Sequence, residues 1–247
     1  MSGASPVRLD ALLVDRGLAA SRERAKSLIE SGVVLIDGIP AQRASTQVKP
    51  DRDIRLASGD FPWVSRGALK LLGAITEFQV LPTGRVCADL GSSTGGFTEV
   101  LVERGAQRVY AIDVGRGQLA WKLRQHERVV VMEGVNARYL ESLPEPISLV
   151  VGDLSFISLT LILPTVRRLL GVDGCAVLLV KPQFEAGRDA IGKGGRVRSD
   201  VARDAAINTV RAAAIERGFA VLGSVDSALP GARAGNVEHF LYLKPTG

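Results

Sequence analysis

The chain has 247 residues, of which 46% are hydrophobic and 23% are charged, a composition typical of a globular protein. No apolar run approaches the roughly 20 residues of a membrane-spanning helix, and the first residues do not have the pattern of a signal peptide. Two cysteines are too few for a disulfide framework or a zinc site, so a reduced, cytoplasmic protein is expected. The net charge of +5 and the isoelectric point of about 9.5 favour a polyanionic partner.

A small unit is predicted from Arg8 to Arg55. Apolar residues at 9, 12 and 13 have helical spacing, and Gly17 ends that helix. Ser21 is placed to cap a second helix, which ends at Gly32. Residues 33–36 form a predicted strand, and the Asp37-Gly38 pair after it indicates a tight turn.

Basic residues line the second predicted helix. From charge alone, a solvated helix face and a phosphate-binding surface are equally open. The blocks R-L-D, L-x-x-R-G-L, S-R-x-x-A-x-x-L-I and G-V-V-x-x-D-G resemble the S4 RNA-binding domain. The resemblance implies a helix pair that positions RNA through its phosphates. The expected RNA-binding residues are Arg8, Arg22, Arg24, Lys26 and Arg66.

Residues 45–62 are polar and predict the end of the small domain and a linker. Residues 63–66 then lead into a helix that continues to about residue 78. We therefore expect two domains, a small one over residues 1–60 and a large one over residues 61–247.

Strands and helices alternate along the large domain. Strands are predicted at 85–90, 108–112, 129–132, 147–152, 175–180, 220–227 and 240–242, with helices at 97–104 and 201–217. This alternation predicts a parallel sheet with helices on both faces, which binds its ligand beyond the carboxyl ends of the strands. Four charged residues lie at or next to those ends: Asp89, Asp113, Asp153 and Lys181.

The turn after the first strand of this sheet reads D-L-G-S-S-T-G-G-F. Its spacing does not fit the G-x-G-x-x-G of dinucleotide-binding proteins. The turn resembles the first motif of class I methyltransferases; the alternative is a glycine turn that serves only close packing. The resemblance implies S-adenosylmethionine as the cofactor, with Asp113 accepting from its ribose hydroxyls. The expected cofactor-binding residues are Asp89, Gly91, Ser92, Gly95, Gly96, Phe97, Asp113, Asn136 and Asp153.

A glycine-rich segment at 187–194 narrowly misses a P-loop, because its last residue is Gly instead of Ser or Thr. It is interpreted as a mobile basic loop that contacts RNA phosphates, or as a plain solvated loop. Its basic residues are Arg188, Lys193, Arg196 and Arg198.

The residues after the fourth strand limit which chemical group can accept the methyl group. They read D-L-S-F, without the Pro-Pro-aromatic motif of amino-methylating enzymes. Methylation of pyrimidine C5 requires a cysteine nucleophile, but Cys87 and Cys175 lie in predicted strands as packing residues. No metal-ligand cluster is visible, and His126 and His239 are expected to be structural.

Four charged residues complete the pattern, although any one alone is more often a surface charge. Lys70, Asp153, Lys181 and Glu238 together resemble the Lys-Asp-Lys-Glu tetrad of the FtsJ-like ribose 2′-O-methyltransferases. With the S4-like segment, the chain resembles the TlyA family, ribosomal RNA 2′-O-methyltransferases also labelled haemolysins. The blocks that carry this resemblance are W-V-S-R-G-A-x-K-L, D-L-G-S-S-T-G-G-F-T, D-L-S-F-I-S-L, L-V-K-P-Q-F-E and G-N-x-E-x-F.

The resemblance implies an α/β fold, a class I Rossmann-like methyltransferase sheet preceded by a small α+β S4-like RNA-binding domain. It implies methylation of a cytidine ribose in ribosomal RNA, with ribosomal subunits as partners. A hydroxyl must lose its proton during methylation. We expect Lys181 to face this hydroxyl and Asp153 to orient Lys181. Lys70 and Glu238 are expected to shape the electric field around the hydroxyl. Coupled titration leaves the identity of the base open.

Two other functions compete with this interpretation. A haemolysin-like membrane-active protein needs an exported chain with a membrane-inserting element, and neither is visible. A non-catalytic RNA-binding protein would not need the intact cofactor and tetrad positions. Neither a membrane nor an obligate protein partner is therefore expected. Some members of the resembled family modify only large-subunit RNA and others modify both subunits. The short extensions before Arg8 and after Tyr242 favour the first type for this chain.

Overall fold

The computed structural model describes residues 5–30, 33–37, 39–41, 43–56, 63–231 and 234–246. It divides into two compact units, Met1–Arg66 and Gly67–Gly247. Among the described residues, no helix combines the length and the apolar character needed to cross a membrane. The predicted helix end at Gly32, Gly38 of the tight turn and linker residues 57–62 lie outside the described residues.

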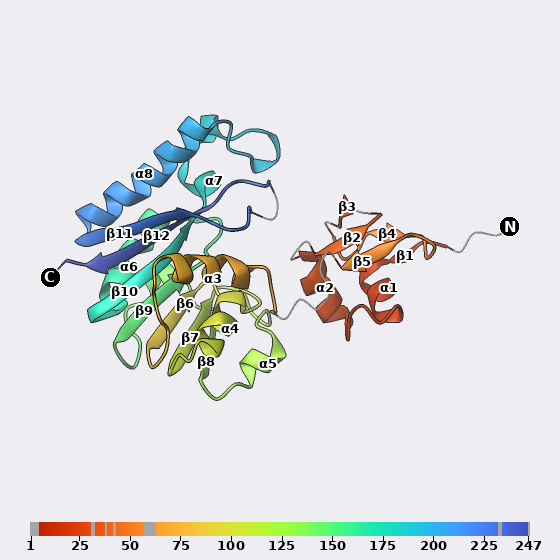
Figure 1. Cartoon of the computed structure of the whole chain (residues 1–247), viewed down its shortest axis with the longest axis horizontal. Coiled ribbons are helices and arrows are strands. Elements are labelled where there is room, and N and C mark those ends of the chain that lie inside the picture. Colours follow the sequence, from red (N-terminus) through yellow and green to blue (C-terminus); the bar gives the residue numbers. More distant parts are fainter. Residues whose placement is uncertain are drawn as a thin grey trace. The chain divides into compact units, whose positions relative to one another are not determined.

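The small unit packs two helices against short strands around one apolar core (Figure 1). Both predicted helices are present, and Ser21 Oγ accepts a hydrogen bond from the amide of Arg24 at 3.1 Å, which confirms the predicted cap. The elements are β1 (Val7–Arg8), α1 (Leu9–Asp15), α2 (Arg22–Glu30), β2 (Val34–Ile36), β3 (Ile39–Pro40), β4 (Gln47–Val48) and β5 (Ile54–Leu56).

Part of the polar segment predicted to close the small domain is sheet. β4 pairs with β1, and β5 pairs with β2 opposite β3. Val48 and Ile54 are buried in the core of the unit. These strands were too short to be recognised from the sequence, since two or three residues carry no clear alternation.

The large unit is built on a seven-stranded sheet of order β11-β12-β10-β9-β6-β7-β8. Its strands are β6 (Val86–Leu90), β7 (Arg108–Asp113), β8 (Val129–Glu133), β9 (Ile147–Gly152), β10 (Leu170–Val180), β11 (Phe219–Asp226) and β12 (His239–Pro245). β6 to β10 are parallel as predicted, while β12 is antiparallel to both β10 and β11. The antiparallel direction of β12 was not predicted. Among the described residues between β11 and β12, which exclude 232–233, no helix returns the chain to the edge where a parallel strand would begin.

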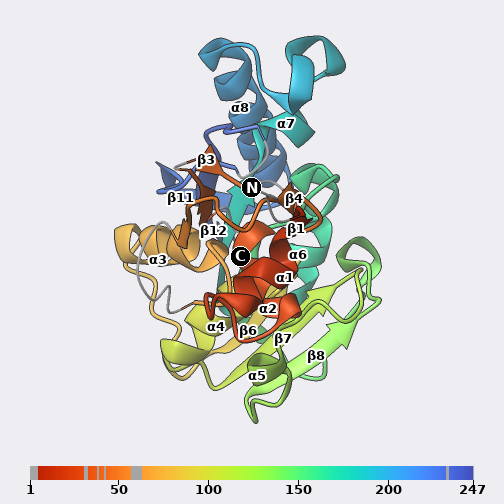
Figure 2. The same ribbon diagram turned by 90° about the vertical axis from the view of Figure 1, so that its right-hand side faces the viewer.

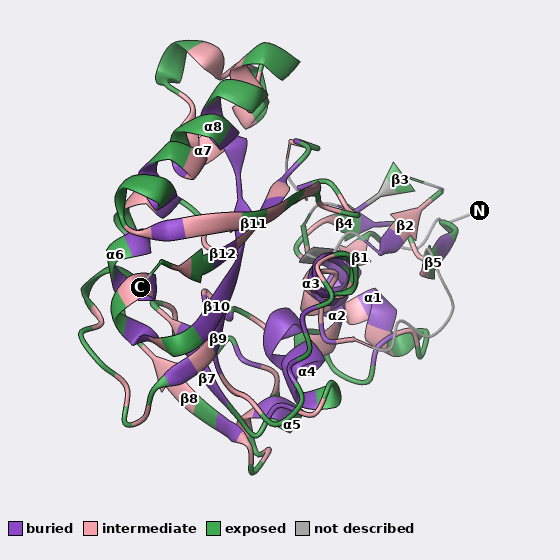
Figure 3. Cartoon of the chain, turned by 60° about the vertical axis from the view of Figure 1, so that its left-hand side comes forward, coloured by how far each residue is buried: buried purple, intermediate pink, exposed green. Residues whose placement is uncertain are grey.

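Helices cover both faces of this sheet (Figure 3). α6 and α8 pack on one face in a core that includes Val166, Val210 and Leu241. α3, α4 and α5 lie on the other side of the sheet, while α7 lies beside α8 (Figure 2). The helices are α3 (Gly67–Glu77), α4 (Gly96–Glu103), α5 (Trp121–Arg124), α6 (Leu163–Leu169), α7 (Pro182–Glu185) and α8 (Asp200–Glu216).

The carboxyl edge of the sheet collects the charged residues singled out from the sequence. Gly152 of β9 is in register with Leu90 of β6 and Leu178 of β10. Asp153 and Lys181 follow these neighbouring strands, so both side chains project at the same edge. The sheet therefore places the candidate site where its topology predicts a ligand.

Candidate active site

The glycine turn between β6 and α4 has a backbone that only glycine adopts readily. Gly91 and Gly95 have φ values of 83° and 98°. A Cβ on Gly91 would lie 3.0 Å from the carbonyl oxygen of Asp153, and one on Gly95 would lie 2.3 Å from a methyl carbon of Leu123. Both glycines therefore let the turn lie close to its neighbours.

The carboxylate of Asp113, at the end of β7, connects this strand to the glycine turn through a hydrogen bond. Its Oδ2 accepts from the amide of Ser93 at 2.8 Å, and its Oδ1 accepts from the amide of Gly115 at 2.7 Å. Each carboxylate oxygen has a second lone pair, so both can still accept from a ligand hydroxyl.

Asp89 lies fully buried near the end of β6. The Thr98 hydroxyl donates to its Oδ2 at 2.7 Å, and within the described residues its Oδ1 has no hydrogen-bond partner. Burial raises the pKa of Asp89 to about 7, and the nearby Asp153 and Asp113 carboxylates contribute to the rise. Thr98, which the sequence analysis missed, follows the glycine turn directly.

These features fit the cofactor that the sequence predicts. The carboxylate of Asp113 can accept from ribose hydroxyls, and the unpartnered oxygen of Asp89 can be satisfied by a donor or a proton. Ser92 is buried within the turn, and Gly96 and Phe97 begin α4. Asn136 lies further away along the chain, where its side chain accepts from the amide of Arg138 at 3.0 Å.

The first lysine–carboxylate pair joins distant parts of the chain. Lys70 of α3 donates from Nζ to Glu238 Oε2 at 2.6 Å. The two side chains are only 11% and 3% exposed. A Cβ on Gly231 would lie 2.7 Å from Oε1 of Glu238, so glycine at this position leaves room for the carboxylate.

The second pair lies across neighbouring strand ends. Lys181 Nζ is 2.6 Å from Asp153 Oδ1 as an ion pair, and it donates to the Ser155 hydroxyl at 2.7 Å. Burial raises the pKa of Asp153, but Lys181 and Lys70 outweigh it, so the pKa lies below its ordinary value. Asp153 is therefore a carboxylate at neutral pH. Ser155 was quoted in the D-L-S-F block but was not singled out from the sequence.

The four tetrad residues thus form two cation–anion pairs, and the attraction of Lys70 for Asp153 connects them. Such a cluster can hold a hydroxyl group and exchange a proton with it.

Other chemistries receive no support among the described residues. Cys87 and Cys175 are both buried, and burial raises the pKa of Cys87 to about 12, which disfavours a thiolate nucleophile. His239 hydrogen-bonds to Asp226 at 2.7 Å and to Ser224 at 2.5 Å. The described residues contain no group of three or more side chains suited to bind a metal.

Part of the basic set in the small unit also holds that unit together. Arg8 and Arg22 pair with the buried carboxylate of Asp10 at 2.9 and 3.0 Å. Hydrogen bonds from Arg8 outweigh burial and, with Arg22, lower the pKa of Asp10 to about 2. The side chains of Arg8 and Arg22 are still 45% and 59% exposed, which leaves their outer faces open to a phosphate.

The remaining members of this set differ in exposure. Arg24 donates to the carbonyls of Trp63 and Val64 at 3.4 Å. Lys26 is exposed on α2, and Arg66 is half-buried just before α3. All five positions, Arg8 and Arg22 included, stay predictions as RNA contacts.

Two family models match the chain. The model for FtsJ-like methyltransferases matches residues 63–244, and that for the S4 domain matches residues 7–54. A 16S/23S rRNA (cytidine-2′-O)-methyltransferase, TlyA of Mycobacterium tuberculosis, is 48% identical over 240 residues, which cover 96% of this chain and 89% of that protein. Hemolysin A of Brachyspira hyodysenteriae is 37% identical over 243 residues, 96% of this chain and 99% of that protein.

Solved structures agree in fold. A hemolysin candidate from Streptococcus thermophilus is 40% identical with a TM-score of 0.77, covering 98% of this chain and 89% of that one. An S-adenosylmethionine-dependent methyltransferase from Mesorhizobium loti is 17% identical with a TM-score of 0.53, covering 69% of this chain and 95% of that one. The expected fold, a methyltransferase sheet preceded by an S4 domain, is confirmed.

Proposed function

The chain belongs to the TlyA family of FtsJ-like methyltransferases, and on this basis we propose that it is an S-adenosylmethionine-dependent ribosomal RNA (cytidine-2′-O)-methyltransferase. The observation that carries the proposal is two lysine–carboxylate contacts at the carboxyl edge of the sheet, the buried pair of Lys70 with Glu238 and the partly exposed pair of Lys181 with Asp153. Four separate segments supply these residues.

The tetrad suits a ribose hydroxyl as the methyl acceptor. When bound, S-adenosylmethionine supplies an activated methyl group. A 2′-hydroxyl is a weak nucleophile until its proton is removed, so a positioned base is needed in the crevice. Lys181 would take this proton in its neutral form. Asp153 and Ser155 would orient its nitrogen, since both contact Nζ.

The second pair has a supporting role in this scheme. Lys70 would keep Asp153 ionised and hold the ribose through its ammonium group, and Glu238 would fix the direction of Lys70. The cofactor would be held by the glycine turn and the carboxylate of Asp113, whose oxygens keep free lone pairs.

The S4 unit supports ribosomal RNA, free or within a ribosomal subunit, as the substrate. Its exposed arginines offer phosphate contacts that position RNA without reading its sequence. An enzyme that modifies ribosomes would act in the cytoplasm.

The decisive experiment is methyl transfer. Purified protein is incubated with radiolabelled S-adenosylmethionine and each ribosomal subunit, and the RNA is digested to nucleosides. We expect label in 2′-O-methylcytidine, and its loss in a Lys181→Met variant. Label in a base or in protein would contradict the proposal. Lysis of red cells by folded protein that transfers no methyl group would favour the membrane-active alternative that the hemolysin relatives suggest.

A further inference from the structure

The segment between α7 and α8, residues 187–198, forms a folded basic hairpin. Gly192 donates its amide to the carbonyl of Arg196 at 2.7 Å, and Arg198 donates to the carbonyl of Ala190 at 3.0 Å. Ile191 and Val197 form an antiparallel bridge between these bonds. The segment predicted as a basic loop thus forms a hairpin whose two arms are hydrogen-bonded to each other.

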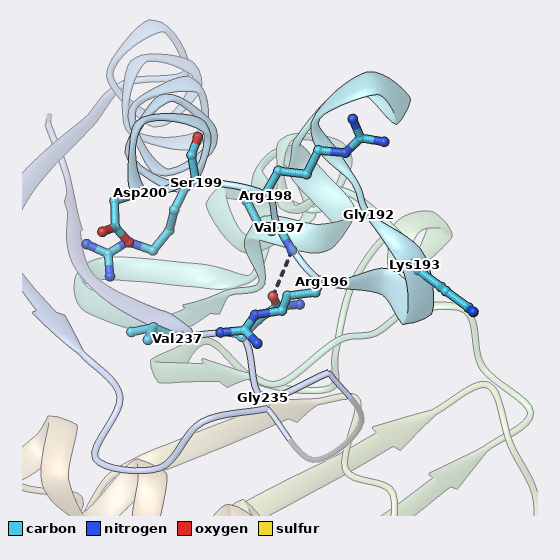
Figure 4. A pocket seen from close by; sticks show the side chains of 11 residues that line it. Gly192, Lys193, Arg196, Val197, Arg198, Ser199, Asp200, Gly235 and Val237 are labelled. Atoms are coloured by element: carbon cyan, nitrogen blue, oxygen red, sulfur yellow. Dashed lines mark hydrogen bonds between the residues drawn. The ribbon is translucent and has the colours of Figure 1, made fainter.

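Asn236 anchors the basic hairpin to the loop before β12. Its Oδ1 accepts from the amide of Val197 at 2.9 Å (the dashed line in Figure 4). Its Nδ2 donates to the carbonyl of Gly195 at 2.9 Å, and the residue is only 6% exposed. One buried amide thus holds the hairpin at its tip and in its second arm. Neither bond was foreseeable from the sequence, since 39 and 41 residues separate the partners.

A pocket of about 470 Å³ lies between the basic hairpin, the start of α8 and the loop that contains Asn236. Its lining residues include four cations and one carboxylate: Lys193, Arg196, Arg198, Arg203 and Asp200. Figure 4 shows that the side chains of Lys193, Arg196 and Arg198 leave the hairpin in different directions. Cations spread in this way suit an extended polyanion better than a single compact ion.

The hairpin cations are also unneutralised. Arg203 pairs with Asp204 at 3.1 Å and with Asp226 at 3.9 Å. No ion pair to Lys193, Arg196 or Arg198 occurs in the described ranges, which contain all three residues. Holding like charges in one folded hairpin costs free energy, and a polyanion would relieve that repulsion.

The pocket is connected to both halves of the tetrad. The basic hairpin follows Lys181 and α7 along the chain, and Asn236 lies two residues before Glu238. An RNA strand bound in the pocket would therefore contact the loop that leads to Glu238 and the hairpin that follows Lys181 and α7.

We propose that this pocket binds the sugar–phosphate backbone of the substrate RNA beside the target nucleotide, with Lys193, Arg196 and Arg198 contacting phosphates and Asn236 as a positioning residue. The inference rests on the proposed function and adds a second RNA-binding surface, separate from that of the S4 unit. It assigns backbone contacts only, because the lining offers charge and no aromatic platform for a base.

The test compares two double variants of the full chain. Arg196→Gln/Arg198→Gln removes two charges from the pocket. The matched control Arg104→Gln/Lys244→Gln removes two exposed charges, from the end of α4 and from β12. The dissociation constant for a ribosomal RNA fragment is measured against salt concentration. The slope of log K should flatten by about 1.4 for the pocket variant, since each single-stranded phosphate contact contributes roughly 0.7. The control should keep the wild-type slope.

A third variant tests the anchor. Asn236→Ala should flatten the salt slope like the pocket variant, while S-adenosylmethionine affinity stays the same. A purely structural role would lower the melting temperature and leave the slope unchanged, which would overturn the role of Asn236.

Two results would overturn the pocket itself. These are a wild-type slope in Arg196→Gln/Arg198→Gln, or weaker binding of that variant to ribosomal subunits without weaker binding to naked RNA. Each can occur while the wild-type enzyme methylates RNA. Failure of the pocket is therefore distinguishable from failure of the proposed function, in which the wild type transfers no methyl group.

Discussion

Replacement of Lys181 tests the proposed base most directly. Lys181→Met keeps an unbranched side chain of similar length and removes both the charge and the proton acceptor. If Lys181 is the base, the single-turnover rate at saturating RNA and cofactor should fall by roughly 10²–10⁴, the usual contribution of a positioned acid or base. Cofactor affinity should change little, since Nζ contacts only Asp153 and Ser155 in its described surroundings.

The structure also bounds the cost in stability. Removal of the ammonium leaves Asp153 without its 2.6 Å partner, although its side chain stays 22% exposed and Lys70 still attracts it. We expect the free energy of unfolding to fall by about 1–3 kcal/mol. In a domain of this size each kcal/mol lowers the melting temperature by roughly 2–4 °C. The rate must therefore be measured well below that melting temperature, with Lys244→Met as an exposed control.

Lys181→Arg separates a base from a positioning cation. Arginine keeps the positive charge but does not lose its proton at any working pH. If Lys181 is the base, this variant should be nearly as slow as Lys181→Met. A rate above about one tenth of the wild type would refute the base assignment. Near-normal rates in both variants would exclude Lys181 from the mechanism.

Three further predictions concern the cofactor, the buried acid and the S4 unit. Asp113→Asn should weaken S-adenosylmethionine binding by about 1–3 kcal/mol; unchanged affinity in calorimetry would contradict the assignment. Since burial raises the pKa of Asp89 to about 7, its protonated form stabilises the fold, and that contribution is lost as pH rises through 7. The melting temperature of the wild type should fall from pH 6 to pH 8, and that of Asp89→Asn should fall less. Equal falls in both proteins would contradict a stabilising role of protonated Asp89. Neutralising Arg22, Arg24 and Lys26 together should flatten the salt dependence of RNA binding without changing cofactor affinity, whereas an unchanged slope would mean that α2 does not contact RNA. This variant should also melt earlier, because Arg22 pairs with Asp10.

The sequence alone determined the elements whose signals are local. Apolar spacing and the Ser21 cap located α1 and α2, and alternating strands and helices predicted the parallel part of the sheet. The D-L-G-S-S-T-G-G-F turn was also recognised, because glycines at fixed spacing report a required backbone conformation, seen in the positive φ of Gly91 and Gly95.

Tertiary structure decided which of these residues meet. Lys70 and Glu238 are separated by 168 residues and form a hydrogen bond only because α3 and the loop before β12 converge at one sheet edge. The antiparallel direction of β12, the pairing of Arg22 with Asp10 and the anchoring of the basic hairpin by Asn236 were likewise not predicted. Periodicity reports only the neighbours of a residue along one helix or strand. Contacts between distant segments depend instead on packing, burial and charge in the folded chain.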